Sequence, residues 1–329
     1  MHEDLVPPED FDGLDIEEIR AILTEDDVIE GLKDLGHEVY QLGLYDELSP
    51  LRKALREIKP HLVFNLLEEF HGQVVFDYHV VAYLELERQP YTGCNSRGLL
   101  LARDKGLSKK ILHYHRIRAP RFAVFPRGRK RQKLPKHLRY PLIVKSLTEE
   151  ASSGISSASV VYDDDSLRRQ VARLHAEVGS DAIAEEYVDG RELYAAVMGN
   201  HRHQMFPLWE LDLRGLPDGE PRIASSDVKW DADYQEQHKI RIHRARGLSA
   251  ELEEQIRKNT RRICKALGLD GYVRIDYRLD RDGRLYFLEA NPNPDIADGQ
   301  EFASAARAAG LGYHEMLQKI VSLGIRRGA

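Results

Sequence analysis

Two alternating runs of residues near the C-terminal end, joined by a short polar turn, limit the possible folds of this chain most strongly. They span Gly271–Asn291 and meet at Asp282-Gly283, a residue pair typical of a two-residue type I′ turn in a β-hairpin. A two-residue loop sets the register of the two strands, and side chains alternate between the two faces. The pattern therefore predicts an antiparallel hairpin with one apolar face and one polar face.

The apolar face of this hairpin belongs in the core of a domain. The predicted register pairs three sets of residues on it: Ile275 with Ala290, Tyr277 with Leu288, and Leu279 with Tyr286. Directly opposed side chains in an antiparallel pair lie close enough to pack against each other. We therefore expect other elements of the chain to cover this face.

The polar face of the hairpin opposes two carboxylates. Asp276 faces Glu289, and Arg274 faces Asn291. Two carboxylates across a ladder repel each other unless a cation compensates them, and oxygen ligands suit a Mg²⁺ ion that arrives with the phosphates of a nucleotide. We interpret Asp276, Glu289 and Asn291 as Mg²⁺ ligands. The alternative is an ordinary surface cluster in which Arg274 neutralises the two acids.

Composition and charge exclude several classes of protein. The 329 residues are enough for about two domains, or for one domain of several lobes. The 48 basic residues are spread along the chain against 54 acidic ones, which gives a net charge of −6 and disfavours a nucleic-acid partner. No apolar run approaches the ~20 residues that cross a bilayer, and the acidic start MHEDLVPPEDFDG does not resemble a secretory signal. We expect a cytoplasmic protein with no membrane partner, in which Cys94 and Cys264 are inert packing residues.

The first 93 residues follow a pattern of alternating helices and strands. Apolar residues recur at helical spacing over 16–35, and the run His61–Leu67 is typical of a buried strand. Such alternation predicts an α/β lobe with a parallel sheet. A lobe of this kind should begin with a hydrophobic strand, whereas the chain opens with polar residues and prolines. We expect this first strand to be missing, either from the protein or from the assigned start of the chain.

The rest of the chain is predicted to form two lobes of α+β structure, over 94–185 and 186–329. After residue 121 the pattern changes to short strands with one long helix; the strands are expected over 122–125, 142–146, 155–162, 182–187 and 192–198, and the helix over 164–178. The last lobe is expected to hold a strand over 204–213, a helix over 249–267, the hairpin and two C-terminal helices.

Five motifs, taken in their order along the chain, resemble one known family. Arg274-x-Asp276 followed by Leu288-Glu-Ala-Asn-Pro292 is similar to the metal-binding signature of ATP-grasp enzymes of the D-alanine–D-alanine ligase branch. The other four pieces are Pro90-Tyr-Thr-Gly93, Asp104-Lys105, Val144-Lys145 with the turn Ser152-Ser-Gly154, and Glu185–Glu192. Each piece alone is a weak signal, but five in register imply an ATP-grasp fold with a pre-ATP-grasp lobe before it.

The resemblance implies a role for each of these motifs. The residues implied to bind the nucleotide are Lys105 and Lys145 at the phosphates, Ser152 and Gly154 in the loop that covers them, Glu185 with the backbone of Glu186 and Val188 at adenine, and Glu192 at the ribose. Lys229 resembles the family lysine near the γ-phosphate, and Arg274 resembles the residue that stabilises a tetrahedral oxyanion.

The position of Lys145 supports its implied role independently. This lysine ends the otherwise apolar run Leu142–Val144, so its ammonium must emerge either beside an anion or at the solvent edge. The Ser152-Ser-Gly154 loop follows it, and the backbone amides of such a loop can close over a phosphate. The loop therefore favours the anion.

The resemblance also implies an activity. ATP-grasp ligases of this branch activate a carboxylate with the γ-phosphate of ATP, and an amine then attacks the acyl phosphate to form an amide. ATP and Mg²⁺ are the implied cofactors, with Mn²⁺ as an alternative metal. The implied substrates are small molecules, namely amino acids or short peptides, and a homodimer is expected. A non-catalytic ATP-binding protein and an ATP-grasp kinase stay open as alternatives, because both would keep the same nucleotide residues.

The predicted substrate side departs from the family pattern. Glu68, Glu69 and His71 follow a predicted parallel strand, where ligands bind in open α/β sheets, although a solvated acidic loop would show the same pattern. Two serines of the family, one of them at the carboxylate of the acceptor, fall here on Ala151 and Gln300. We expect a substrate that is larger or more cationic than D-alanine, with Glu68, Glu69, His71 and Gln300 near it.

Overall fold

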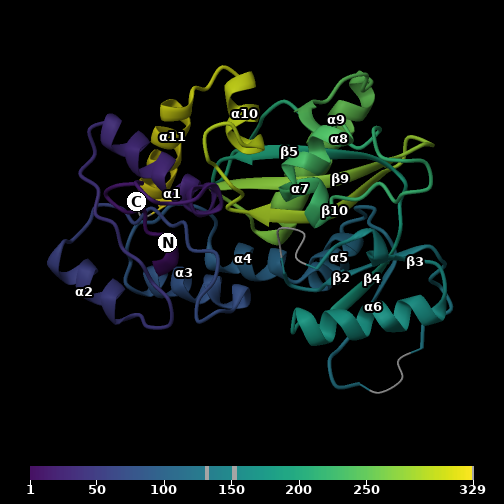
Figure 1. Cartoon of the computed structure of the whole chain (residues 1–329). Helices are drawn as coiled ribbons and strands as arrows, with labels where there is room; N and C mark the ends of the chain where they lie inside the picture. Colours follow the sequence, from purple (N-terminus) through teal and green to yellow (C-terminus); the bar gives the residue numbers. More distant parts are fainter. Residues whose placement is uncertain (130–132, 150–153, 328–329) are drawn as a thin grey trace.

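Two antiparallel sheets form the centre of the molecule, and an N-terminal lobe lies beside them (Figure 1). The computed structural model describes residues 1–129, 133–149 and 154–327. The smaller sheet has the order β1-β4-β2-β3, with β1 (Phe122–Phe125), β2 (Leu142–Ser146), β3 (Val160–Val161) and β4 (Ala182–Glu186). The larger sheet has the order β10-β9-β5-β7-β8, with β5 (Gly190–Met198), β7 (Trp209–Asp212), β8 (Arg241–Arg244), β9 (Tyr272–Asp280) and β10 (Leu285–Pro292), and with β6 (Gln204–Met205) paired to β5.

Two of the predicted strands form only in part. The segment 155–162 keeps only β3, because Ser156 and Ser159 exchange side-chain and backbone hydrogen bonds and cap a short 3-10 helix (Ser157–Ser159). The segment 204–213 is divided into β6 and β7 around Pro207, a residue that cannot donate to a ladder. The predictions for β1, β2, β4 and β5 are confirmed to within two residues.

The helices begin and end where polar caps place them. Asp15 accepts hydrogen bonds from the backbone at the start of α1 (Ile16–Asp34), and α9 (Ala250–Leu267) ends at Gly268 in a left-handed conformation, φ 67°. The other α-helices are α2 (Ser49–Glu57), α3 (Asp77–Leu86), α4 (Ser96–Arg103), α5 (Lys105–Tyr114), α6 (Asp164–Glu177), α7 (Ser226–Trp230), α8 (Ala232–Gln237), α10 (Glu301–Ala308) and α11 (Tyr313–Arg327). Over the described part of the chain, no helix is long and apolar enough to cross a membrane.

The N-terminal lobe differs from the prediction in its sheet. All of residues 1–93 are described, and none of them belongs to a regular strand. Parallel pairing is reduced to two bridges, His2 with Leu44 and Val63 with Tyr91. Two residues after Val63, the backbone N–H of Asn65 donates to the side-chain hydroxyl of Thr92 at 3.0 Å. This N–H does not pair with a backbone carbonyl, so the ladder ends here. The predicted parallel direction is confirmed, but the continuous strand over 61–67 was wrong. The predicted lobe boundaries near residues 93 and 185 stay predictions.

The hairpin turn is one residue longer than predicted. The backbone N–H of Asp280 donates to the carbonyl of Arg284 at 3.0 Å, so the loop consists of the three residues 281–283. Within this loop only Gly283 is left-handed, with φ 76°, whereas a two-residue type I′ turn needs two left-handed residues. A three-residue loop with glycine in its last position avoids placing Asp282 in that unfavourable conformation.

A bulge at Leu288 then restores the predicted register. Next to the turn, Leu279 faces Leu285 and Tyr277 faces Phe287, so the predicted partners Tyr286 and Leu288 were wrong. The register shifts between Phe287 and Glu289, because a bulge adds one residue to one strand only. Beyond this shift every predicted pair is confirmed: Ile275 with Ala290, Asp276 with Glu289, and Arg274 with Asn291.

The apolar face of the hairpin is buried, as predicted. Tyr277 and Phe287 are fully buried in the largest apolar cluster, together with residues of α4, α5 and α9. The Tyr277 hydroxyl forms a hydrogen bond of 2.8 Å with the Thr260 side chain of α9, which satisfies the buried polar end of the ring. Cys94 and Cys264 are free and buried in the same cluster, which confirms their predicted packing role.

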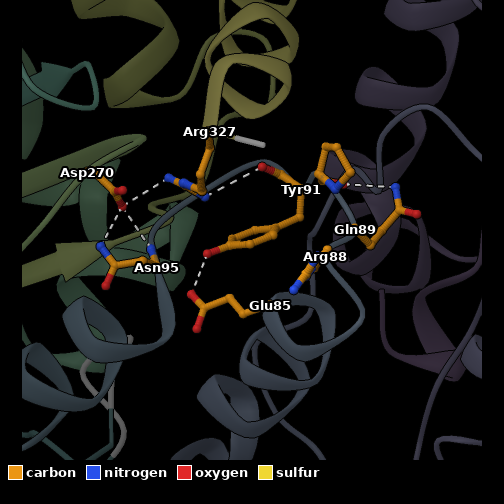
Figure 2. Close-up of a pocket in the computed structure, with 8 residues that line it drawn as sticks. Glu85, Arg88, Gln89, Tyr91, Asn95, Asp270 and Arg327 are labelled. Carbon is orange, nitrogen blue, oxygen red and sulfur yellow. Dashed lines mark hydrogen bonds and ion pairs between the residues drawn. The ribbon is translucent and has the colours of Figure 1, made fainter. Parts of the chain in front are cut away.

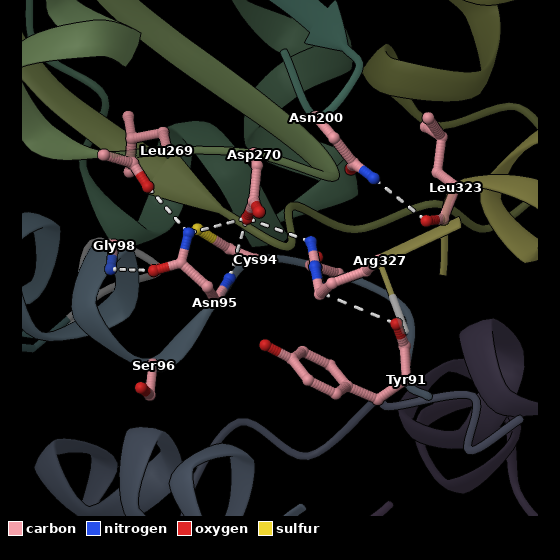
Figure 3. Close-up of polar contacts among 12 residues, drawn as sticks. Tyr91, Cys94, Asn95, Ser96, Gly98, Asn200, Leu269, Asp270, Leu323 and Arg327 are labelled. Atoms are coloured by element: carbon pink, nitrogen blue, oxygen red, sulfur yellow. Dashed lines mark hydrogen bonds and ion pairs between the residues drawn. The ribbon is translucent and has the colours of Figure 1, made fainter. Parts of the chain in front are cut away.

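A polar junction joins the N-terminal lobe to the start of β9. The Asp270 carboxylate accepts hydrogen bonds from the Asn95 backbone and side chain, both at 2.8 Å, and pairs with Arg327 of α11 at 3.0 Å (Figure 3). Arg327 also donates to the Gly93 carbonyl at 2.6 Å. Three segments far apart in the sequence therefore meet at one carboxylate.

Gly271 is the closest backbone approach in this junction. It has φ 71°, and a Cβ at this position would lie 2.2 Å from the Gly93 carbonyl oxygen. We predict that Gly271→Ala lowers the free energy of unfolding by about 1–3 kcal/mol more than Gly219→Ala does. Gly219 is the control because it has φ 90° but open space around it. Equal losses in denaturant unfolding of the two variants would contradict the close approach.

Candidate active site

The centre of the site is the pair of opposed carboxylates on β9 and β10. Asp276 is 3% exposed, and the Glu289 side chain is 27% exposed. The Asn291 side-chain amide donates to Asp276 Oδ2 at 2.9 Å. These three side chains were predicted as metal ligands, and the structure brings them together on the polar face of the hairpin.

Each carboxylate has its own cation. Arg274 holds Asp276 in a two-pronged ion pair, with Nε to Oδ1 at 2.8 Å and Nη2 to Oδ2 at 3.1 Å. The Arg274 guanidinium also lies over the Tyr194 ring, 4.8 Å from its centroid. Glu289 pairs with Lys105 instead, with Oε2 to Nζ at 3.6 Å. Arg274 is therefore not the common counter-ion of both acids, as the surface-cluster interpretation required.

The pKa values of the two carboxylates shift in opposite directions. Burial raises the pKa of Asp276, and the adjacent Arg274 guanidinium opposes this rise without cancelling it. Burial would also raise the pKa of Glu289, but the ammonium groups of Lys105, Lys145 and Lys229 outweigh it and hold this pKa well below its usual range. Glu289 is thus a carboxylate at neutral pH, which is the form that binds a cation.

The donor set fits Mg²⁺ that is bound together with phosphate. In the described ranges no group of three or more His, Cys, Asp or Glu side chains could hold a metal ion by itself. Two carboxylates and one amide leave several coordination positions for phosphate oxygens and water, which is how Mg²⁺ is usually held in nucleotide sites. The hard oxygen ligands of Asp276, Glu289 and Asn291 suit this ion.

Three buried lysines, Lys105, Lys109 and Lys145, face the carboxylates of Glu289 and Glu185. Glu185, at the end of β4, is 1% exposed and lies 3.1 Å from Lys109 Nζ and 3.6 Å from Lys145 Nζ. Lys105, the first residue of α5, contacts Glu289 and also donates to the carbonyl of Glu149. Among the described side chains named here, three ammonium groups face two carboxylates, a balance that favours an anion.

The other predicted nucleotide residues follow β4 into β5. Glu186 pairs with Arg121 at 2.6 Å, and its backbone N–H donates to the Arg121 carbonyl. Val188 lies between these strands. The buried Glu192 carboxylate is held by Arg278 and by the Tyr194 hydroxyl, the latter at 3.0 Å. The roles of these residues at adenine and ribose stay predictions.

The predicted phosphate loop is described only from Gly154 onward, and Ser152 lies outside the described residues. Gly154 has φ 71°, and its carbonyl accepts a hydrogen bond of 2.6 Å from Arg173 of α6. Lys229, predicted near the γ-phosphate, lies on α7, where its charge lowers the pKa of both Asp276 and Glu289. The structure thus brings Lys229 to the carboxylate pair.

The predicted substrate residues are less closely grouped. Glu69 lies 3.5 Å from His2, and His71 is 66% exposed and faces Asp46 at 4.0 Å. Glu68 lies near Tyr272 at the start of β9. Burial raises the pKa of the Tyr272 phenol, and the charge of Glu68 raises it further. Gln300 precedes α10 as its N-cap residue. The substrate roles of Glu68, Glu69, His71 and Gln300 stay predictions.

Lys109 and Arg278 are polar residues of the site that sequence analysis missed. Lys109 follows Lys105 by four residues on α5, and this helical spacing places both on one face, so the signal was present. Arg278 follows Asp276 by two residues on β9, and alternation places both on one face of the strand. Neither residue was singled out, because burial of a single cation is not visible in a sequence.

A separate cavity of about 430 Å³ lies on the junction between the lobes (Figure 2). It is lined by Glu85, Arg88, Gln89, Pro90, Tyr91, Asn95, Asp270 and Arg327. Its carboxylates already have partners: Glu85 accepts hydrogen bonds from Tyr91 and Ser96, both at 2.6 Å, and Asp270 binds Arg327. None of the predicted nucleotide, metal or substrate residues lines it.

Comparisons with known proteins show which proteins this chain is similar to. The family model described as "D-ala D-ala ligase C-terminus" matches residues 110–322. A D-alanine–D-alanine ligase of Nitrosospira multiformis is 31% identical over 254 residues, which are 77% of each chain. The y4sG protein of Sinorhizobium fredii is 30% identical over 314 residues, 92% of this chain and 87% of the relative. The crystal structure of the D-alanine–D-alanine ligase of Bacillus anthracis complexed with ATP covers 96% of each chain with a TM-score of 0.74 at 24% identity.

The two sheets with the carboxylate pair between them define the ATP-grasp class, and the likeness to the Bacillus anthracis structure confirms the fold. The match over residues 110–322 then shows the family: this chain belongs to the D-alanine–D-alanine ligase family. Members of this family are ATP-grasp C–N ligases, so the predicted family and fold are confirmed.

We predict that Glu289→Gln lowers ATP turnover at least about 100-fold, because the neutral amide cannot replace a carboxylate ligand. Glu57→Gln, at an exposed position on α2, is the control and should leave turnover unchanged. Turnover is measured as release of phosphate, and the melting temperature of each variant shows that it is folded. Wild-type turnover in a folded Glu289→Gln variant would exclude Glu289 from the metal site.

Proposed function

We propose that this protein is an ATP-dependent carboxylate–amine ligase that forms an amide or peptide bond through an acyl phosphate. The observation that carries the proposal is the opposition of Asp276 and Glu289 beside Arg274, with buried lysines on the phosphate side. Membership of the ligase family supports the same activity. ATP and Mg²⁺ are the proposed cofactors, and the cytoplasm and a homodimer stay predictions.

In the first proposed step a substrate carboxylate is activated. One of its oxygens attacks the γ-phosphorus of ATP, the bond from that phosphorus to the β,γ-bridging oxygen breaks, and ADP leaves. Lys105, Lys145 and Lys229 would hold the phosphate charge, and Asp276, Glu289 and Asn291 would hold Mg²⁺, which neutralises the transferring group. The protein's work in this step is positioning and charge compensation.

In the second proposed step an amine completes the amide. Its nitrogen attacks the carbonyl carbon of the acyl phosphate, the resulting tetrahedral intermediate releases inorganic phosphate, and the nitrogen loses a proton. Arg274 uses Nε and Nη2 to bind Asp276, which orients the guanidinium and leaves Nη1 to donate to the oxyanion.

The substrate is proposed to be an amino acid or short peptide that is larger or more cationic than D-alanine. Burial would lower the pKa of Arg274, but nearby carboxylates raise it above its usual range. Asp276 contributes most to this rise, and Glu301 at the start of α10 contributes less. A carboxylate there disfavours a second carboxylate nearby. Gln300 is longer than the serine that grips the acceptor in the family pattern, and Glu68 would suit an ammonium group.

The first test screens amino acids and short peptides for ATP-dependent phosphate release, with mass spectrometry of the products. We predict release with a cationic or larger amine substrate and an amide as the product. A phosphorylated product would indicate a kinase instead, and the absence of Mg²⁺-dependent ATP binding in calorimetry would indicate a non-catalytic protein. Dialanine as the main product at millimolar D-alanine would overturn the proposed substrate but not the proposed ligase activity.

A second test addresses Glu68. We predict that Glu68→Gln raises the KM of the amine substrate about 10-fold, because the amide can still accept a hydrogen bond from an ammonium but no longer carries the charge that strengthens it, and leaves the KM of ATP nearly unchanged. The control is again Glu57→Gln. Equal changes of both KM values in Glu68→Gln would place Glu68 outside the substrate site.

A further inference from the structure

Lys109 is the most deeply buried cation of the site, and no implied role accounts for it. Its side chain is 1% exposed, and its ammonium lies 5.4 Å from the centroid of the Phe287 ring. A buried ammonium is costly unless charged or polar groups surround it. Burial lowers the pKa of Lys109 to about 8. The charged ammonium is therefore still the main form at neutral pH, despite the cost of desolvation.

Two contacts of Lys109 reach two different parts of the site. Its Nζ lies 3.1 Å from Glu185 Oε1 on β4, in the smaller sheet. The same Nζ donates a hydrogen bond to the backbone carbonyl of Leu288 on β10, in the larger sheet. One side chain of α5 therefore links the two sheets between which the carboxylate pair lies.

Leu288 is the bulged residue of the hairpin, and its carbonyl is the group that Lys109 contacts. The register of β10 shifts between Phe287 and Glu289, and a bulge leaves its extra residue outside the regular ladder. Lys109 supplies a partner for the carbonyl at this point. Without the bulge, alternation would turn the Glu289 carboxylate to the other face of the hairpin.

The charges show that Glu185 does not need Lys109 for neutrality. Lys145 also pairs with Glu185, at 3.6 Å, and Lys105 pairs with Glu289. Removal of the Lys109 charge leaves two ammonium groups facing two carboxylates, so no buried carboxylate loses its only cation. A purely structural requirement could thus be met by an apolar side chain of similar length.

We propose that Lys109 is a positioning residue, which holds the Leu288 bulge and thereby orients the Glu289 carboxylate that would bind the Mg²⁺ accompanying the nucleotide. This inference rests on the proposed ATP- and Mg²⁺-dependent function. Lys109 touches neither substrate nor metal in this role; it acts through Leu288 and Glu289. Outer-shell groups of this kind change metal affinity by about 10–100-fold when they are replaced.

The test uses two variants. Lys109→Met keeps a side chain of similar length without the charge, and Lys109→Gln keeps a hydrogen-bond donor for the Leu288 carbonyl. Lys110→Met, at the exposed next position of α5, is the control. Binding of Mn²⁺ in the presence of the non-hydrolysable β,γ-imido analogue of ATP is followed by electron paramagnetic resonance, and melting temperatures are recorded. We expect Mn²⁺ affinity to fall at least about 10-fold in Lys109→Met, to fall less in Lys109→Gln, and to stay unchanged in Lys110→Met.

Two outcomes separate this inference from the proposed function. If the wild-type protein does not bind Mn²⁺ with the analogue, the proposed function fails. If the wild-type protein binds, and both Lys109 variants bind equally well while their melting temperatures fall, Lys109 is only structural and the inference is overturned. Loss of Mn²⁺ affinity with a melting temperature close to that of the wild-type protein supports it.

Discussion

The repulsion between two carboxylates held across one ladder is the constraint on which the rest of this structure depends. Asp276 and Glu289 face each other on the polar side of the hairpin, and a protein keeps such a pair only where cations compensate it. Arg274 compensates Asp276 from the same strand, whereas Lys105 reaches Glu289 from α5. The charge of Glu289 in the larger sheet is therefore compensated by a lysine of α5.

Further cations act on this pair from other parts of the fold. Lys145 comes from the smaller sheet and Lys229 from the insertion between β7 and β8, and the charges of both act on Glu289. Among the described residues, positive charge gathered in this way is unfavourable unless an anion joins it, which supports the proposed phosphate site. Near α10, Glu301 adds a negative charge that acts on Arg274. The proposed nucleotide end and the proposed substrate end of the site therefore have different charged neighbours.

Much of the fold and the central pair of the site could be predicted because the signals are local. Caps such as Asn95 and Ser249 and the alternation in the hairpin are encoded within a few residues. The predicted opposition of Asp276 and Glu289 is correct although the turn was wrong, because the bulge at Leu288 offsets the longer loop. A two-residue pattern cannot distinguish a two-residue loop from the last two positions of a three-residue loop that also ends in glycine.

The sequence by itself determined the types of most elements, the apolar face of the hairpin and the residues of the carboxylate pair, because periodicity and turn chemistry act over short distances. Only the tertiary structure decided that the N-terminal lobe reduces its parallel sheet to bridges and that Lys109 is buried against Leu288, 179 positions away. The burial of an ammonium depends on partners that distant segments bring to it. Motifs in the sequence pointed to Lys105, Lys145 and Lys229, whereas the helical spacing of Lys109 from Lys105 could not show that packing would bury its ammonium against Leu288.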